Sequence, residues 1–396
     1  MTSSGQQPGN LEALAIEKEM DQVLHCKRGT TRLTLPNPSP EQGLSGKVFG
    51  LMAKVLLSPL LCPLGQTKRK YTFQGDVIAV KRPLWWRLLD GLAARVLLAP
   101  IILAIFLIVV MHSNTHPTRI HASITPASMG LHFKRAQLVT VDDQVLRGWY
   151  IPPVSVMEMA TNPQVLSLRK WPAVVLCHGM GTTHEQYLVL AEQLHRAGFA
   201  VLMLDMRGLG ASDPAAVTYG LREPLDVLAG VQYLRELPNI DSSKVCVIGR
   251  DIGAMAALQA AALDSTIAAV VVDGLWPRFE ERARNIFAQP GGWNIPLDWL
   301  APLYTVTFEM AMQDRVQRLD PMAMVRRLHS RPAFFVARQG DDFMPLEEVM
   351  TLATNIGSPH EIMIAGPGAG HGAFEARVSE FLKEATGWKG MGWKEN

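Results

Sequence analysis

The pattern of hydrophobic positions along this chain changes near Ile120. Beyond that point, short apolar runs alternate with longer segments whose apolar residues recur at helical spacing. This alternation is typical of a mostly parallel sheet covered by helices on both faces. The apolar runs predict eight strands, at Leu131–Val141, Val145–Ile151, Ala173–Cys177, Ala200–Leu204, Val245–Ile248, Ala268–Val272, Ala333–Ala337 and Glu361–Ile364. The periodic segments predict helices at Glu185–Ala197, Glu223–Glu236, Ile252–Leu263, Leu346–Ile356 and Phe374–Ala385.

Two departures from the alternation are expected. The first two strands should form a hairpin, because Asp142 and Asp143 provide turn residues between them. The segment of residues 275–331 adds no strand–helix unit, and we interpret it as an inserted lid. Its apolar residues favour a small hydrophobic molecule or an acyl chain as substrate. They are Trp276, Phe279, Phe287, Trp293, Trp299, Leu303 and Phe308.

The longest apolar run lies before the alternating region. Val96–Met111 contains no charged residue, and extension back to Leu92 gives about 30 Å of helix, enough to cross a bilayer core. Basic residues precede this run at Lys81, Arg82, Arg87 and Arg95. The positive-inside rule then places the N-terminus in the cytoplasm and the C-terminal domain on the extracytoplasmic side. We therefore expect a single-pass membrane protein with a transmembrane helix at about 92–111, the alternative being a buried core helix.

The remaining N-terminal sequence completes the expected domain organisation. Residues 1–45 are polar and predict a mobile tail. Residues 46–118 form a membrane-proximal region, in which Val48–Leu64 favours an interfacial segment. A second membrane pass there would reverse the orientation. Residues 120–390 then form the main α/β domain.

Composition excludes several functional classes. The 396 residues include 38 basic and 36 acidic side chains, so charge gives no reason to expect nucleic acid as a partner. The four cysteines have no metal-ligand spacing, and Cys177 and Cys246 lie in apolar runs where cysteine is usually a buried hydrophobe. No cofactor or metal motif is present, so neither is expected. Protein partners are not indicated.

Five segments carry the chemical signals. In chain order they are Cys177–Gly181 (CHGMG), Asp205–Ser212 (DMRGLGAS), Gly249–Gly253 (GRDIG), Gly340–Pro345 (GDDFMP) and Gly368–Gly372 (GAGHG). Together they resemble the α/β-hydrolase fold over residues of about 130–390. Within that superfamily the chain is most similar to membrane-anchored bacterial members of the serine-hydrolase, lysophospholipase-like and dipeptidyl-peptidase-like branch. The expected fold class is therefore α/β, with an N-terminal membrane segment.

The resemblance implies a role for each member of a catalytic set. Asp251 occupies the nucleophile position of the G-x-S-x-G elbow, between a strand and a helix. The backbone N–H groups of Met180 and Ile252 would form an oxyanion hole. His371 would be the general base and Asp341 its orienting acid. Asp342 is the competing candidate for the acid.

An aspartate at this position changes the chemistry. A carboxylate is ionised at neutral pH and suits displacement at saturated carbon, with an alkyl-enzyme ester that water then hydrolyses. Haloalkane dehalogenases and epoxide hydrolases of this fold work in that way. The chain departs from their patterns, because Ile252 stands where they commonly have tryptophan, Tyr304 is the lid's only tyrosine, and Met180 replaces the usual proline.

Three hypotheses follow. In the first, Asp251 is the nucleophile of an active hydrolase. In the second, the domain has lost turnover and serves as a membrane-tethered binding or scaffold module, with Arg250 neutralising Asp251 in an ion pair. In the third, the hydrolase uses another nucleophile such as Ser212 or Thr182, or water activated without a metal.

Four further features have plainer interpretations. His178 is expected to brace the oxyanion loop. Asp205 and Arg207 are expected to stabilise local turns, and the lid tryptophans are expected to pack rather than to bind substrate.

Overall fold

The computed structural model describes residues 67–71, 77–81 and 84–390, apart from 163, 167–168, 277, 289–296, 339–345, 357–359 and 366–370. Side chains are described from residue 96 onward, except those of Ala365 and His371. The chain divides into two compact units, residues 1–110 with 290–293 and the remainder. The predictions for the tail at 1–45 and for Val48–Leu64 lie outside the described residues.

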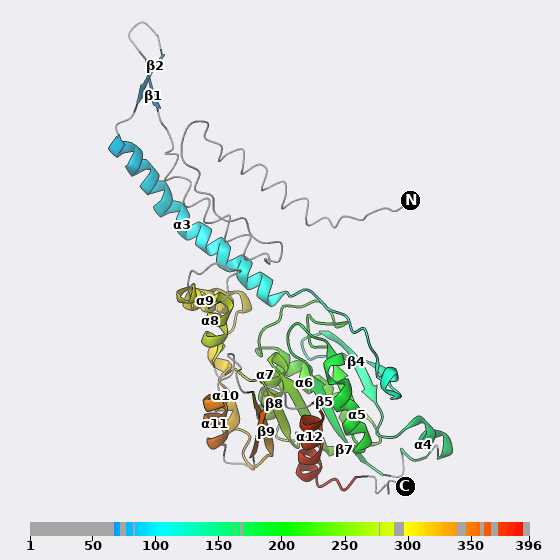
Figure 1. Cartoon of the computed structure of the whole chain (residues 1–396). Helices are drawn as coiled ribbons and strands as arrows, with labels where there is room; N and C mark the ends of the chain where they lie inside the picture. The colour runs from blue at the N-terminus through cyan, green and yellow to red at the C-terminus, as the bar shows by residue number, and fades with distance from the viewer. Residues whose placement is uncertain are drawn as a thin grey trace, which may run out of the picture. The chain divides into compact units, whose positions relative to one another are not determined.

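The first unit contains a hairpin and most of a long helix. Strands β1 (Thr67–Tyr71) and β2 (Val77–Lys81) pair in antiparallel fashion. Helix α3 (Leu84–Thr115) follows (Figure 1). Its segment Val96–Thr115 has a mean hydropathy of 2.7 and is mostly exposed. Among the described residues, it is the one helical segment long and apolar enough to cross a membrane. The helical segment ends at Thr115 rather than at Met111, the end expected from the sequence, because the polar residues that follow Met111 are also helical.

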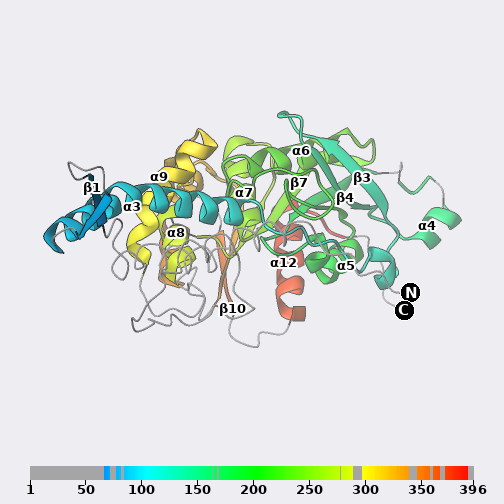
Figure 2. The ribbon, with the colours of Figure 1, turned by 90° about the horizontal axis from the view of Figure 1, so that it is seen from above.

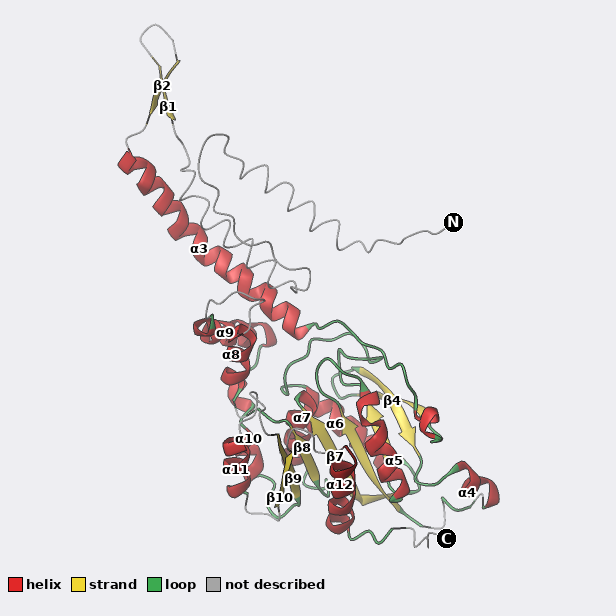
Figure 3. Ribbon diagram, viewed as in Figure 1, coloured by secondary structure: helices red, strands yellow, loops and turns green. Residues whose placement is uncertain are grey.

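The second unit is built on an eight-stranded sheet with the order β10-β9-β8-β7-β5-β6-β4-β3 (Figure 3). The strands are β3 (Lys134–Val139), β4 (Val145–Ile151), β5 (Trp171–Cys177), β6 (Ala200–Leu204), β7 (Ile240–Arg250), β8 (Val270–Asp273), β9 (Ala333–Arg338) and β10 (His360–Ala365). The strand β4 pairs in antiparallel fashion with β3 and β6, and the other pairs are parallel. The eight predicted strands and the predicted hairpin are thus confirmed.

Helices cover both faces of this sheet (Figure 2). The helices of this unit are α4 (Val156–Thr161), α5 (Leu188–Arg196), α6 (Glu223–Glu236), α7 (Ile252–Leu263), α8 (Phe279–Ala288), α9 (Ala301–Met312), α10 (Pro321–Arg326), α11 (Leu346–Thr354) and α12 (His371–Thr386). Those that pack against the sheet are α5, α6, α7, α11 and α12. Leu176 joins a buried cluster with Leu194 of α5 and Phe381 of α12. Its neighbour Val175 lies against Gly230 of α6 on the opposite face. This alternation along β5 follows from the two-residue period of a strand and places the core on both sides.

The chain between β8 and β9, which we call the insertion, is helical. Helices α8, α9 and α10 are accompanied by the 3₁₀ turns η3 (Asp298–Leu300) and η4 (Val316–Arg318). The sequence pattern did not assign α9, because this helix is largely apolar and shows no clear stripe at helical spacing.

Candidate functional site

The expected nucleophile lies in a strained turn. Strand β7 ends at Arg250, and α7 begins at Ile252, so Asp251 alone connects them. Its φ of 53° and ψ of −117° fall in a region that non-glycine residues rarely adopt. Hydrogen bonds hold the turn, because the Asp251 N–H donates to the carbonyl of Asp273, at 3.0 Å. The Asp251 carbonyl accepts from the N–H groups of Ala254 and Met255.

Glycines make this turn possible through close approach of backbone to backbone. A Cβ atom at Gly249 would overlap the backbone of Gly253. A Cβ atom at Gly253 would overlap the carbonyl of Cys177, the last residue of β5. One at Gly179 would lie 3.0 Å from the Asp251 Cβ atom. The glycines of the first and third motifs therefore bring the two segments together.

The structure brings Asp251 to the expected oxyanion loop. The Met180 N–H donates to Oδ2 of Asp251, at 3.0 Å. The Ile252 N–H lies at the first position of α7 and also favours the ionised carboxylate. One carboxylate oxygen is therefore fixed by the donor that the sequence assigned to the oxyanion hole.

Opposing influences act on the pKa of Asp251. Burial raises the pKa above its ordinary value. The charges of Arg282 and Arg250, together with the N–H groups of Met180 and Ile252, act in the opposite direction without cancelling this increase. Arg282 comes from α8, and its guanidinium carbon lies 5.7 Å from the ring centre of Tyr219. Sequence reasoning missed Arg282, because no local spacing relates α8 to the elbow.

The prediction of an ion pair between Arg250 and Asp251 is wrong, because Arg250 pairs with Asp273 instead. The Nε atom of Arg250 lies 3.8 Å from Oδ2 of Asp273. Arg250 and Asp273 are register partners on the adjacent parallel strands β7 and β8, which places the two side chains together. Arg250 therefore influences Asp251 through its charge, while its contact is with Asp273.

His178 stabilises the loop that carries Met180, as the sequence predicted. This side chain is buried, and its Nδ1 lies 2.8 Å from the carbonyl of Gly179. The Met206 N–H donates to Nε2 of the same ring, at 3.2 Å. His184 contacts Asp205 at 2.5 Å. Burial opposes ionisation of Asp205, but its contacts with His178 and His184 hold its pKa well below the ordinary range.

Arg207 also has the turn-stabilising role expected of it. Its guanidinium pairs with Asp226 at 2.7 Å and with Asp142 at 2.6 Å. These contacts join the β3–β4 turn to the first turn of α6 behind the site. Arg207 therefore supports the scaffold.

The alternative nucleophiles are committed to other contacts. The Ser212 hydroxyl is buried, donates to the carbonyl of Asp205 at 2.6 Å and accepts from the Arg147 N–H at 2.9 Å. The Thr182 hydroxyl donates to the carbonyl of Gly179, at 3.0 Å. Ser212 in particular has its hydrogen-bonding capacity used in stabilising a turn, which argues against the third hypothesis.

Other expected members of the site are only partly described. Asp341 and its competitor Asp342 lie outside the described residues. His371 is the first residue of α12, and its side chain lies outside the description as well. Within the described part of the chain, no group of three His, Cys, Asp or Glu side chains is arranged to hold a metal ion.

The insertion contributes a buried aromatic cluster. Tyr219 packs against Trp276, Phe279 and Phe308, with ring centres 6.2, 5.9 and 5.9 Å away. Tyr304 belongs to the same cluster. Trp276 is buried and packs, as expected, whereas Trp299 is exposed and Trp293 lies outside the described residues.

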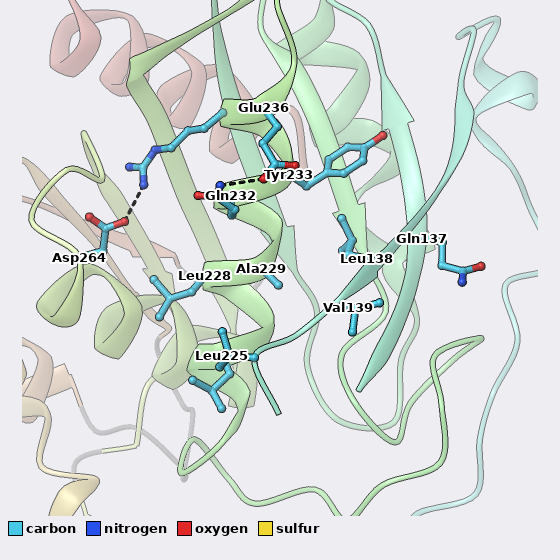
Figure 4. Close-up of a pocket in the computed structure, with 12 residues that line it drawn as sticks. Gln137, Leu138, Val139, Leu225, Leu228, Ala229, Gln232, Tyr233, Glu236 and Asp264 are labelled. Carbon is cyan, nitrogen blue, oxygen red and sulfur yellow. Dashed lines mark hydrogen bonds and ion pairs between the residues drawn. The ribbon is translucent and has the colours of Figure 1, made fainter. Parts of the chain in front are cut away.

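Two surface hollows of about 560 Å³ each lie elsewhere. One lies between the edge strand β3 and α6, where Leu138 and Val139 face Leu225 and Tyr233 (Figure 4). The other lies between the insertion and α11. Neither hollow is lined by Asp251 or Met180. Neither hollow therefore marks the catalytic position.

Comparisons with known proteins are consistent with this arrangement. A family model described as the alpha/beta hydrolase family matches residues 174–384. An uncharacterised Mycobacterium tuberculosis protein is 25% identical, over 59% of this chain and 70% of its own length. A Penicillium polyketide transferase is 24% identical, over 46% of this chain and 53% of its own length. The structure of a Pyrococcus furiosus esterase matches with a TM-score of 0.53 and 22% identity, over 69% of this chain and 98% of that chain. These findings confirm the fold that the five segments predicted.

Proposed function

The chain belongs to the alpha/beta hydrolase family, and we propose that it is a membrane-anchored hydrolase in which Asp251 attacks a small hydrophobic or lipid-like substrate. The observation that carries the proposal is the hydrogen bond from the Met180 N–H to one carboxylate oxygen of Asp251. A relative named thiohydrolase, 28% identical over 33% of this chain, supports hydrolysis as the reaction class.

The geometry suits attack at a saturated carbon. Oδ2 of Asp251 is held by Met180, which leaves the other oxygen to form a bond to the substrate carbon. The bond from that carbon to its leaving group breaks, and the leaving group departs with the electron pair. The product is an alkyl ester of Asp251. The ionised carboxylate needs no base for this step, and the charge of Arg282 favours that form against the effect of burial.

Hydrolysis of the ester would complete the cycle. His371, oriented by Asp341, takes a proton from water, and the resulting hydroxide adds to the ester carbonyl carbon. Met180 and Ile252 then stabilise the negative charge that develops on the carbonyl oxygen. The alcohol leaves with a proton, and one oxygen of the regenerated carboxylate comes from water.

A single-turnover experiment in heavy-oxygen water tests this sequence. The full-length chain in detergent is mixed in excess over an aliphatic epoxide or haloalkane, and the peptide containing Asp251 is analysed by mass spectrometry. We expect one heavy oxygen in the Asp251 carboxylate and no turnover in Asp251→Asn. Asp241→Asn, at the other end of β7, is the control that should retain both label and turnover.

Absence of the label, together with unchanged hydrolysis by Asp251→Asn, would exclude Asp251 as the nucleophile. If none of a broad panel of electrophiles is turned over, the result would favour a second candidate function, a hydrolase-like module without turnover.

That second candidate is a hydrolase-like module without turnover. It is favoured by the same hydrogen bond, because Asp251 occupies the Met180 donor that a serine enzyme would use for its substrate. Asp251→Ser would free this donor. If the scaffold is of the serine type, the variant should release p-nitrophenol from a short ester in a burst, whereas the parent chain should not.

The membrane anchor is also part of the proposal. Val96–Thr115 would span the bilayer with the N-terminus in the cytoplasm and the second unit outside. Protease added to intact spheroplasts should then digest the second unit. Digestion only after lysis of the inner membrane would contradict this orientation.

A further inference from the structure

One face of the insertion is exposed and almost wholly apolar. Trp299 of η3 and Leu303, Val306 and Met310 of α9 are 62%, 42%, 53% and 75% exposed. Their spacing of four, three and four residues places them along one side of the helix, over about 17 Å. We call these four residues the α9 stripe. Exposed apolar residues are ordinary singly, but a continuous row marks a surface that contacts another apolar phase.

Two polar side chains of α9 beside the stripe are hydrogen-bonded within the protein, whereas the carboxylate of Asp298, next to Trp299, is exposed. The Thr307 hydroxyl donates to the carbonyl of Leu303 in the preceding turn, at 2.8 Å. Glu309 accepts the Val316 N–H at 3.0 Å, which directs its carboxylate toward η4. Transfer of the stripe into an apolar medium would therefore leave neither group without its hydrogen bond.

Contacts within the second unit connect α9 to the end of the apolar segment of α3. The Thr115 carbonyl accepts the Val217 N–H at 2.7 Å, and the Asn114 carbonyl accepts the Tyr219 hydroxyl at 3.2 Å. The Tyr219 ring packs against Phe308, on the buried side of α9. A single aromatic residue thus lies between the last turn of α3 and the helix that bears the stripe.

We propose that the α9 stripe docks into the surface of the bilayer that α3 spans, so that the insertion faces substrate dissolved in lipid. The inference rests on the proposed membrane anchor, because a span that ends at Thr115 brings the lipid surface close to Tyr219 and hence to α9. Trp299 at one end of the stripe suits the interface, where an indole can combine apolar contact with a polar N–H.

A bilayer fits the stripe better than a protein partner does. The four side chains offer only the Trp299 N–H and the Met310 thioether for directional contacts, and none of the four carries a charge that would select a partner. A lipid surface requires apolar area alone. A second copy of the chain is the main competing occupant and is distinguished by the experiment.

Collision accessibility of nitroxide labels provides the test. Single cysteines at Leu303, Val306 and Met310 are labelled in the full-length chain in phosphatidylcholine nanodiscs. Native Cys26 and Cys62 are replaced by serine in this background. The control is a label at Val189 of α5, a valine of comparable exposure, 48% against 53% for Val306. We expect a several-fold higher ratio of oxygen to nickel-chelate collisions at the three stripe positions than at Val189.

Labels at Ile101 and Ile105 of α3 test the anchor separately. Lipid-like accessibility there with water-like accessibility at the stripe would overturn the docking inference and leave the anchor standing. Water-like accessibility at both would overturn both. Protection of the stripe from oxygen and nickel alike, which is lost when each nanodisc holds one chain, would assign the stripe to a second copy and also overturn the inference.

Discussion

At the scale of the residue, the ionisation of Asp251 depends on a charge from a distant segment. Burial raises the pKa of Asp251, and the positive charge of Arg282 opposes that increase. Ester formation needs the ionised carboxylate, so its rate should fall at acid pH with a midpoint above 3.8, the ordinary value. Arg282→Gln removes a charge that favours ionisation, so the midpoint should move to still higher pH. Single-turnover ester formation measured across pH checks this.

Arg284→Gln provides the matched control for that prediction. Arg284 lies on the same helix, α8, but on its exposed side, so its loss should leave the acid midpoint unchanged. An unchanged midpoint in Arg282→Gln would show that Arg282 does not govern the ionisation of Asp251.

At the scale of the element, the first turn of α6 fixes the loop that receives the end of α3. Glu223 is buried and accepts the N–H groups of Thr218 and Gly220 and the hydroxyl of Thr218. Between them, Tyr219 has a φ of 55°. Glu223→Gln replaces one acceptor by a donor and leaves a buried N–H unsatisfied, at a cost of about 1–3 kcal/mol. The urea midpoint of the full-length chain in detergent should fall accordingly.

Glu236→Gln, at the other end of α6, is the control. Its carboxylate accepts from the exposed Gln232 amide, and its replacement should change the free energy of unfolding by less than about 0.5 kcal/mol. Equal midpoints for the two variants would show that the Glu223 contacts contribute little.

The same elements show why prediction from sequence succeeded for the sheet and failed for part of the site. Helices α6 and α7 have the predicted bounds, because Pro238 follows the end of α6 and the buried strand β7 leads directly into α7. The backbone motif around Asp251 was predictable because each glycine serves a close approach within it. The position of Arg282 was not, since it depends on how α8 folds back over the sheet. Likewise, Arg250 was assigned to its neighbour in sequence, whereas strand register pairs it with Asp273.

At the scale of the whole molecule, the proposed membrane anchor and the α9 stripe together predict that substrate reaches the insertion from the bilayer. If the α9 stripe lies in lipid, turnover of a bilayer-dissolved substrate should depend on the stripe, and turnover of a water-soluble one should not. Met310→Asp places a charge at the most exposed stripe position. Burial of a methionine side chain is worth about 1.5–3 kcal/mol, so the ratio kcat/KM for a long-chain epoxide in nanodiscs should fall by at least about tenfold.

The comparison of substrates separates docking from damage to the fold. A short epoxide in water should be turned over equally by Met310→Asp and the parent chain, because the substitution is at an exposed position away from Asp251. Val189→Asp, an exposed apolar position on α5, should preserve turnover of both substrates. A parallel loss on both substrates in Met310→Asp would point to a disturbed insertion. Equal turnover of both would mean that substrate reaches Asp251 from water, with the stripe serving another purpose.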